Sequence, residues 1–136
     1  MSFKRLLFAL LLLSSLSPFA DAADRLKDFV MRTGETVYAR FEVDGRKLKL
    51  VSASKTPDPA AQVVFSLVKN GEKKSVDLRV ENKLPKDLLY RAEIRAPSHN
   101  LKAPARVTPV VGGKLAFENF PELVEEFSAF DFKLAK

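Results

Sequence analysis

The sequence predicts an all-β domain, a two-sheet antiparallel β-sandwich of about seven strands. Three observations lead to this fold class. Apolar and polar residues alternate with a period of two along most of the chain, turn residues recur about every eight to twelve positions, and long helical patterns are missing. Successive side chains of a strand point to opposite faces of a sheet, so this alternation is typical of half-buried strands.

Residues 1–22 have the three parts of a secretory signal peptide. The start is basic, 6–13 is an unbroken apolar run, and Ala20 and Ala22 satisfy the small-x-small rule for signal-peptidase recognition. A membrane-spanning helix needs about 20 consecutive apolar residues, which this run does not reach. We therefore expect the leader to be cleaved, leaving an exported protein that does not span the membrane.

Residues 23–136 are expected to form a single domain. The chain contains no cysteine, whereas small domains of oxidising compartments are often rich in disulfides. A domain of this length can bury roughly two thirds of its unfolded surface and needs no such bridge. The composition therefore favours a bacterial periplasm, or secretion from a bacterium, over a eukaryotic extracellular space.

The chain is cationic. Its formal net charge of +6 falls to about +5 when the leader, with two basic residues and one acidic residue, is removed. A cationic protein is attracted to anionic lipids, acidic polysaccharides and nucleic acids. A few net charges also keep a small domain soluble. Because Lys and Arg form no dense run, solubility explains the charge most simply.

The first predicted hairpin joins the segments 35–43 and 46–54. The Asp-Gly pair at 44–45 suits a two-residue type I′ turn. A turn of this length sets Phe41 opposite Leu48, so that the apolar residues of both strands share one face. Turn chemistry and alternation therefore predict the same hairpin.

The second predicted hairpin joins 62–69 and 72–82 through the Asn-Gly pair at 70–71. The two-residue register sets Phe65 opposite Val76. A slip by one residue would turn the whole apolar set of one strand toward solvent, so the inward face is strongly specified.

The rest of the chain predicts a third hairpin, two further strands and two short helical turns. The glycines at 112–113 are expected to join 105–111 to 114–120, with Pro109 at an edge or bulge because it cannot donate to a ladder. The remaining elements are strands at 88–96 and 127–134 and helical turns at 24–31, near the N-terminus, and at 121–127, before the last strand.

The predicted sandwich is immunoglobulin-like and fibronectin-like in general architecture. The number of strands and their alternation support this description. The cysteine pair and the tryptophan that pin many immunoglobulin domains are absent from the chain. The description therefore concerns architecture and implies no function.

No catalytic residue, metal or cofactor is predicted. Zinc sites use clustered Cys, His and carboxylate ligands, but the chain has one histidine and no cysteine. It also lacks a Gly-x-Ser-x-Gly nucleophile turn and a phosphate-binding glycine loop. With no tryptophan and two tyrosines it lacks the stacking platforms of single-stranded nucleic-acid binders, so no specific nucleic-acid partner is expected.

Basic residues on the outward strand faces form a candidate binding face. In the first hairpin Arg40 is expected opposite Lys49, and like charges directly opposite each other are mildly destabilising. If the strands share a sheet, these residues form a plate for an anionic partner; interleaved carboxylates would neutralise it. The candidate face comprises Arg40, Lys47, Lys49, Arg79, Arg91 and Arg95.

The segment 96–106 is a second candidate, because it is longer than a tight turn needs and long ordered loops often carry binding residues. It could equally be a connection that crosses between sheets. The candidate binding residues are Ser98, His99, Asn100, Leu101 and Lys102.

These observations favour a non-catalytic interaction module that binds a protein or an anionic component of the cell envelope. One alternative is a carrier that holds a small apolar ligand between its sheets. The other alternative is a hydrolase that uses carboxylates alone, but no sequence motif supports it.

Overall fold

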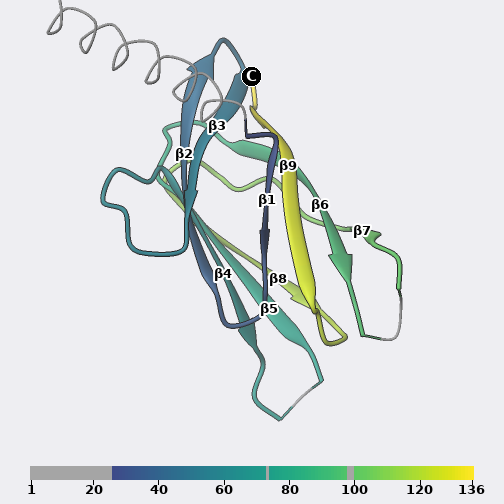
Figure 1. The fold of residues 1–136 in the computed structure, drawn as a ribbon. Coiled ribbons are helices and arrows are strands. Elements are labelled where there is room, and N and C mark those ends of the chain that lie inside the picture. The colour runs from purple at the N-terminus through teal and green to yellow at the C-terminus, as the bar shows by residue number, and fades with distance from the viewer. Residues whose placement is uncertain (1–25, 73, 98–99) are drawn as a thin grey trace, which may run out of the picture.

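The structure of the chain is a computed structural model, and it describes residues 26–72, 74–97 and 100–136. The predicted leader, with Ala20 and Ala22, lies outside the described residues. Within them the chain forms nine strands (Figure 1): β1 (Asp28–Met31), β2 (Thr36–Asp44), β3 (Lys47–Ser54), β4 (Val63–Lys69), β5 (Val76–Asn82), β6 (Leu88–Arg95), β7 (Ala103–Ala105), β8 (Leu115–Phe120) and β9 (Glu126–Leu134).

The all-β prediction is confirmed, but the strands form one curled antiparallel sheet. Neighbours follow the order β7-β6-β9-β3-β2-β4-β5-β8, and β1 pairs with β9 beside this path. The pair Lys47↔Lys133 joins β3 to β9 and so makes the sheet continuous. The predicted division into two separate sheets is therefore not confirmed. Figure 1 shows the sheet curling so that β6 and β9 lie across from β4 and β5.

The two predicted helical turns are wrong. The described part of 24–31 contains strand β1, which pairs with β9 through Phe29↔Ala129, and no helix forms at 121–127, where β9 begins at Glu126. Short apolar runs fit helical and extended spacing equally well. Residues 28–31 become a strand because they pair with the free side of β9. No helix in the described ranges is long and apolar enough to cross a membrane.

The first hairpin forms with a register that differs from the predicted one by two residues next to the turn and, beyond a bulge between Arg40 and Phe41, by three. Asp44↔Lys47 closes the turn, with Gly45 at φ 64°, and Phe41 pairs with Leu50. Between the turn and the bulge the shift is even and keeps the side chains on their faces, because the side-chain period is two, whereas beyond the bulge Ala39 pairs with Ala53. Phe41 and Leu50 are therefore both buried, as the alternation predicts.

The second hairpin has a loop that is longer than the predicted two-residue turn. Lys69↔Val76 is its last strand pair, and the Asn70 amide donates to the Ser75 carbonyl at 3.0 Å. Phe65 consequently pairs with Val80 and not with Val76. This shift is also even, so the inward face predicted for both strands is retained.

The third predicted hairpin is absent. β8 pairs with β5 instead, and β7 pairs with β6. The amide and the carbonyl of Val110 both bond to Leu88, at 2.9 Å each. The segment before the glycine pair therefore gives its hydrogen bonds to β6 and cannot pair with β8.

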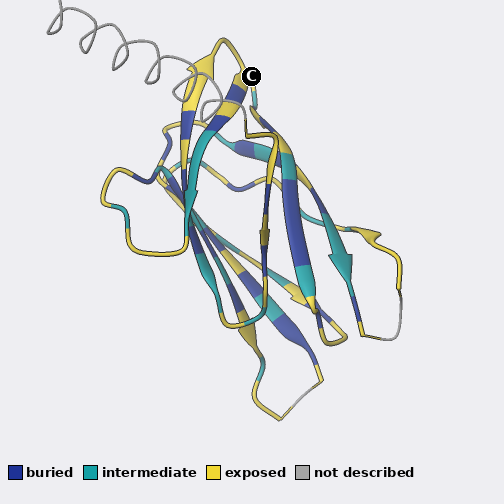
Figure 2. Cartoon of the chain, in the orientation of Figure 1, coloured by how far each residue is buried: buried dark blue, intermediate teal, exposed yellow. Residues whose placement is uncertain are grey.

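Aromatic side chains from five different strands fill the interior of the curled sheet. Phe65 is completely buried and packs edge-on against Phe29 and Tyr90, with ring centroids 4.8 and 5.6 Å away. Phe132 lies 4.9 Å from Phe41 and is stacked with Phe29 at 6.0 Å. Figure 2 shows the buried residues alternating with more exposed ones along the strands.

A bulge in β9 changes which residues of this strand point inward. Its register against β6 shifts between Leu89 and Arg91, and Asp131 has φ 54°. A residue in this left-handed conformation is typical of bulges, and Asp tolerates it better than most residues do. Ala129 and Phe132 are thus both buried although they are three positions apart.

Candidate binding site

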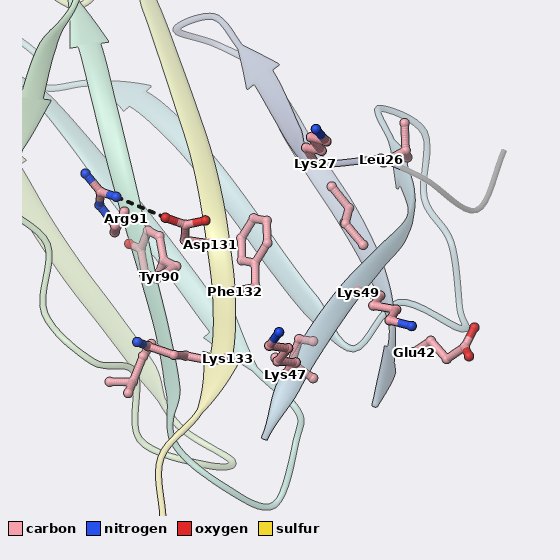
Figure 3. Close-up of a pocket in the computed structure, with 13 residues that line it drawn as sticks. Leu26, Lys27, Glu42, Lys47, Lys49, Tyr90, Arg91, Asp131, Phe132 and Lys133 are labelled. Carbon is pink, nitrogen blue, oxygen red and sulfur yellow. Dashed lines mark hydrogen bonds and ion pairs between the residues drawn. The ribbon is translucent and has the colours of Figure 1, made fainter. Parts of the chain in front are cut away.

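A groove in the described part of the chain lies where β3 and β9 diverge. Beyond Lys47↔Lys133 the two strands separate, and the chain before β1 reaches across through a bridge between Leu26 and Leu50. The resulting groove has a volume of about 1050 Å³ (Figure 3). We call it the corner groove. It is lined by the apolar residues Leu26, Leu48, Leu50, Leu89, Tyr90 and Phe132 and the charged residues Lys27, Glu42, Lys47, Lys49, Arg91, Asp131 and Lys133.

Local strand periodicity builds both layers of the corner groove. Lys47 and Lys49 alternate with Leu48 along β3, so the lysines are exposed at the rim while the leucine is buried below them. In β9 the same alternation places Lys133 outward beside the buried Phe132. The corner groove therefore has an apolar floor that belongs to the core and a charged rim that belongs to the outer face.

The rim has five cations and two carboxylates, and two of the cations are paired. Arg91 is 3.0 Å from Asp131, and its guanidinium lies 5.2 Å from the Phe130 ring centroid. Lys49 lies 3.6 Å from Asp44, outside the corner groove. Both pairs are largely exposed to solvent, where such pairs are weak.

Three rim lysines have no ion pair among the described residues: Lys27, Lys47 and Lys133. Lys47 and Lys133 are direct partners across the β3–β9 ladder. Like charges in this position repel each other. Both ammonium groups are therefore available to an anion, which would also relieve their repulsion.

Tyr90 contributes a buried hydroxyl with no hydrogen-bond partner among the described residues. Burial, and after it the charge of Glu118, raise the pKa of this phenol far above its usual range. Tyr90 therefore stays neutral at physiological pH. Its ring forms part of the wall of the corner groove.

The six residues of the predicted basic face divide into two groups. Lys47, Lys49 and Arg91 meet at the corner groove, whereas the other three lie elsewhere. Arg40 pairs across the ladder with Ser52, not with Lys49, and its guanidinium is 3.2 Å from Asp58. Arg79 lies on β5, between its ladder partners Ser66 and Phe117; Arg95 lies at the end of β6.

Arg95 is held by two carboxylates, at 3.0 Å from Glu125 and 2.9 Å from Glu126. The hydrogen bond from Arg95 is the main cause that lowers the pKa of Glu126, and the same bond is the main cause that raises the pKa of Arg95. This arginine is already neutralised by its neighbours. Arg95 is therefore less available to an anionic partner than the rim lysines are.

The predicted binding loop connects β6 to β7, which are hydrogen-bonded neighbours. It is therefore a hairpin loop and does not cross between sheets. Ser98 and His99 lie outside the described residues. Leu101 is 80% exposed, and Lys102 reaches back to Glu126 at 3.9 Å and to the Ser128 hydroxyl at 3.4 Å. Asn100 is also exposed.

Sequence reasoning missed Lys27 and Lys133 at the rim and Phe132 at the floor. The alternation of the last strand does place Lys133 outward, which is a usable signal. Its neighbours, however, come from β3 and from the chain before β1, far away in sequence. Only the pairing of the chain ends with the middle strands brings these residues together.

In the part of the chain that the structure describes, no three His, Cys, Asp or Glu side chains are grouped so as to hold a metal ion. No protein-family model matches the chain, and no curated protein or solved structure matches it either. The geometry and charge of the corner groove therefore carry the functional argument.

Proposed function

We propose that this chain is a non-catalytic binding protein of the bacterial periplasm or exterior, which holds an anionic component of the cell envelope in its corner groove. The observation that carries the proposal is the set of three rim lysines, Lys27, Lys47 and Lys133, that form no ion pair among the described residues. The export signal predicted at 1–22 supports the location.

Electrostatics supports an anionic partner. A cleft with an excess of charge of one sign over low-dielectric walls focuses the field and raises the local concentration of counter-ions. The rim has such an excess, with five cations and two carboxylates. The buried floor residues supply such walls. At the junction of β3 and β9, an anion between Lys47 and Lys133 replaces a repulsive pair by two attractive contacts.

The lining supports binding without catalysis. It contains no histidine, serine, threonine or cysteine among the described residues. Of its two carboxylates, Asp131 is bound to Arg91 at 3.0 Å, and Glu42 is the direct ladder partner of Lys49. Neither arrangement pairs two acids for general acid–base chemistry.

A second candidate is the carrier of an apolar ligand. It is favoured by Phe132 and Tyr90, which belong to the aromatic core and also line the corner groove. Native mass spectrometry of the purified protein would reveal a co-purifying neutral lipid. A ligand without negative charge would favour this carrier over the anion-binding protein.

Charge reversal at the β3–β9 junction tests the proposed function. The double variant K47E/K133E is compared with K69E/R79E, which makes the same change of charge at exposed positions away from the corner groove. Each protein is mixed with phosphatidylglycerol vesicles or an acidic polysaccharide, and with phosphatidylcholine vesicles or neutral dextran as controls.

The wild type should bind at least one anionic probe and neither neutral one. K47E/K133E should lose about tenfold in affinity at low salt, while K69E/R79E should lose less than about twofold. Equal losses in the two variants would show that net charge, and not the corner groove, governs binding. That result would overturn the proposal.

A further inference from the structure

We propose that the ligand of the corner groove is a single-chain anionic amphiphile, bound as a monomer. Its head group lies between Lys47 and Lys133, and its alkyl chain runs over Phe132 toward Leu26. This inference rests on the proposed function, because it assumes that the corner groove binds an anion. It adds the chemical class of the ligand and the direction in which the ligand lies.

The arrangement of the lining supports this orientation. Figure 3 shows Lys47 and Lys133 at one end of the corner groove, Leu26 at the other and Phe132 between them. The charged end lies where β3 and β9 are joined by their single ladder pair, Lys47↔Lys133. The apolar end is where Leu26, which is 42% exposed, bridges to the buried Leu50. Lys27 also lies at this end, next to Leu26 (Figure 3), so the rim is cationic at both ends, and the apolar path for a chain is the floor that runs from Phe132 to Leu26 beneath the rim.

The apolar part is already formed before any ligand arrives. Phe132 is held by Phe41 at 4.9 Å and by Phe29 at 6.0 Å, and its stacked neighbour Tyr90 lies 6.4 Å away. A rigid floor costs little ordering entropy when a chain binds to it. A volume of about 1050 Å³ also falls near the upper end of the usual range for small-molecule pockets, roughly 300–1,000 Å³.

The same lining disfavours a sugar. A polysaccharide presents many hydroxyl groups, which need hydrogen-bonding partners when they leave water. The lining has no amide side chain among the described residues, and its one hydroxyl is the buried one of Tyr90. Apart from that hydroxyl, its polar side-chain groups are the charged ones at the rim. An anionic head with an apolar tail matches this division, and a uniformly polar chain does not.

Calorimetric titration with a series of alkyl phosphates tests the inference. Butyl, octyl and dodecyl phosphate are used below their critical micelle concentrations, with inorganic phosphate as the head group alone and dodecyl maltoside as a neutral molecule of the same chain length. The dissociation constant should fall by up to about fourfold for each methylene that is buried. Dodecyl maltoside should bind at least about tenfold more weakly than dodecyl phosphate.

Substitutions at the apolar end separate the tail from the head group. Leu26→Asp should weaken dodecyl phosphate binding by about tenfold and leave butyl phosphate binding within about twofold. Leu26 is exposed and precedes the first strand, so this change spares the core. The matched control is Leu101→Asp, which makes the same change on the exposed β6–β7 loop and should alter neither affinity.

The outcomes separate this inference from the proposed function. If all phosphates bind equally well and K47E/K133E abolishes binding, the corner groove is an anion site and the amphiphile is overturned. If the protein binds phosphatidylglycerol vesicles but no monomeric alkyl phosphate, the partner is a membrane surface and the amphiphile is overturned again. If no anionic probe binds at all, the proposed function falls together with the inference.

Discussion

The β4–β5 ladder and the β3–β9 junction show how differently one sheet can be joined. β4 and β5 pair along their whole length, from Val63↔Asn82 to Lys69↔Val76, and the side chains between them and the opposite strands are closely packed. β3 and β9 share one pair, Lys47↔Lys133, and then diverge. The long ladder builds the core, whereas the short junction leaves the corner groove. In this fold, incomplete pairing is the source of the candidate site.

Replacing a buried phenylalanine by alanine in each of the two regions should have the largest effect on the free energy of unfolding. Phe65→Ala is expected to lower the free energy of unfolding by about 4–5 kcal/mol, because the cavity it leaves is sealed on every side. Phe132→Ala should cost about 3 kcal/mol or less, since solvent from the corner groove can fill the space. Urea unfolding measures both values. Equal losses would contradict the description of Phe132 as a groove residue.

Substitution of Asn82 measures how much its hydrogen bonds stabilise the well-paired side of the sheet. Asn82 is buried, its amide donates to the carbonyls of Lys86 and Val110 at 3.0 Å each, and its oxygen accepts from Leu84 at 2.9 Å. Asn82→Ala removes the partners of the Lys86 carbonyl and the Leu84 amide, while the Val110 carbonyl keeps its bond from the Leu88 amide, and should cost about 2–3 kcal/mol in the free energy of unfolding. Asn119→Ala, which removes an exposed hydrogen bond to Asp77, is the control and should cost less than about 0.5 kcal/mol.

The ion pair between Glu126 and Arg95 lies at the end of β9 away from the junction, and the pKa of Glu126 tests its strength. The folded-state pKa of Glu126 lies below the ordinary value of 4.5, mainly because of the hydrogen bond from Arg95. A lowered pKa stabilises the fold above the unfolded pKa, and this contribution is lost as the pH falls through the folded value. NMR titration should find this pKa below 4.5 and raised in Arg95→Gln. An unchanged pKa in that variant would refute the assigned cause.

Lys133→Glu should have the smallest effect on stability and the clearest one on function. It converts the repulsive Lys47↔Lys133 pair into an attractive one and should raise the free energy of unfolding by about 0.5 kcal/mol or less. Anion binding should fall in the same variant. Lys49→Glu, which sets two acids opposite each other at Glu42, should change stability in the opposite direction. Thermal unfolding together with calorimetry measures both effects, and loss of stability in Lys133→Glu would contradict the prediction.

Alternation was enough to predict which residues of the hairpins face inward. Val63, Phe65 and Leu67 are buried as expected, because a period of two admits one inward set for each strand. The registers next to the turns were missed by two and by four residues, because turn length depends on which residues close the loop, and the bulge between Arg40 and Phe41 adds one more residue to the first shift. At the second hairpin the bond between Asn70 and Ser75 lengthens the loop beyond the Asn-Gly pair.

The candidate site was half predictable. Lys47, Lys49 and Arg91 follow from outward strand positions, and they meet at the corner groove. Lys27 was assigned to a helical turn, and Lys133 had no predicted neighbour. The missing information is the pairing of β9 with β3 and β6, which joins the end of the chain to its middle. No local pattern encodes such a contact.

The sequence by itself determined an all-β chain, the inward faces of its hairpins and a cationic surface, because these follow from side-chain period and composition. The tertiary structure decided that the strands form one curled sheet, that the segment before the glycine pair bonds to β6, and that β3 and β9 meet at a single pair. Those outcomes depend on competition among strands for backbone hydrogen bonds. Each amide and carbonyl can serve few partners at once, and only the folded chain shows which partner it bonds.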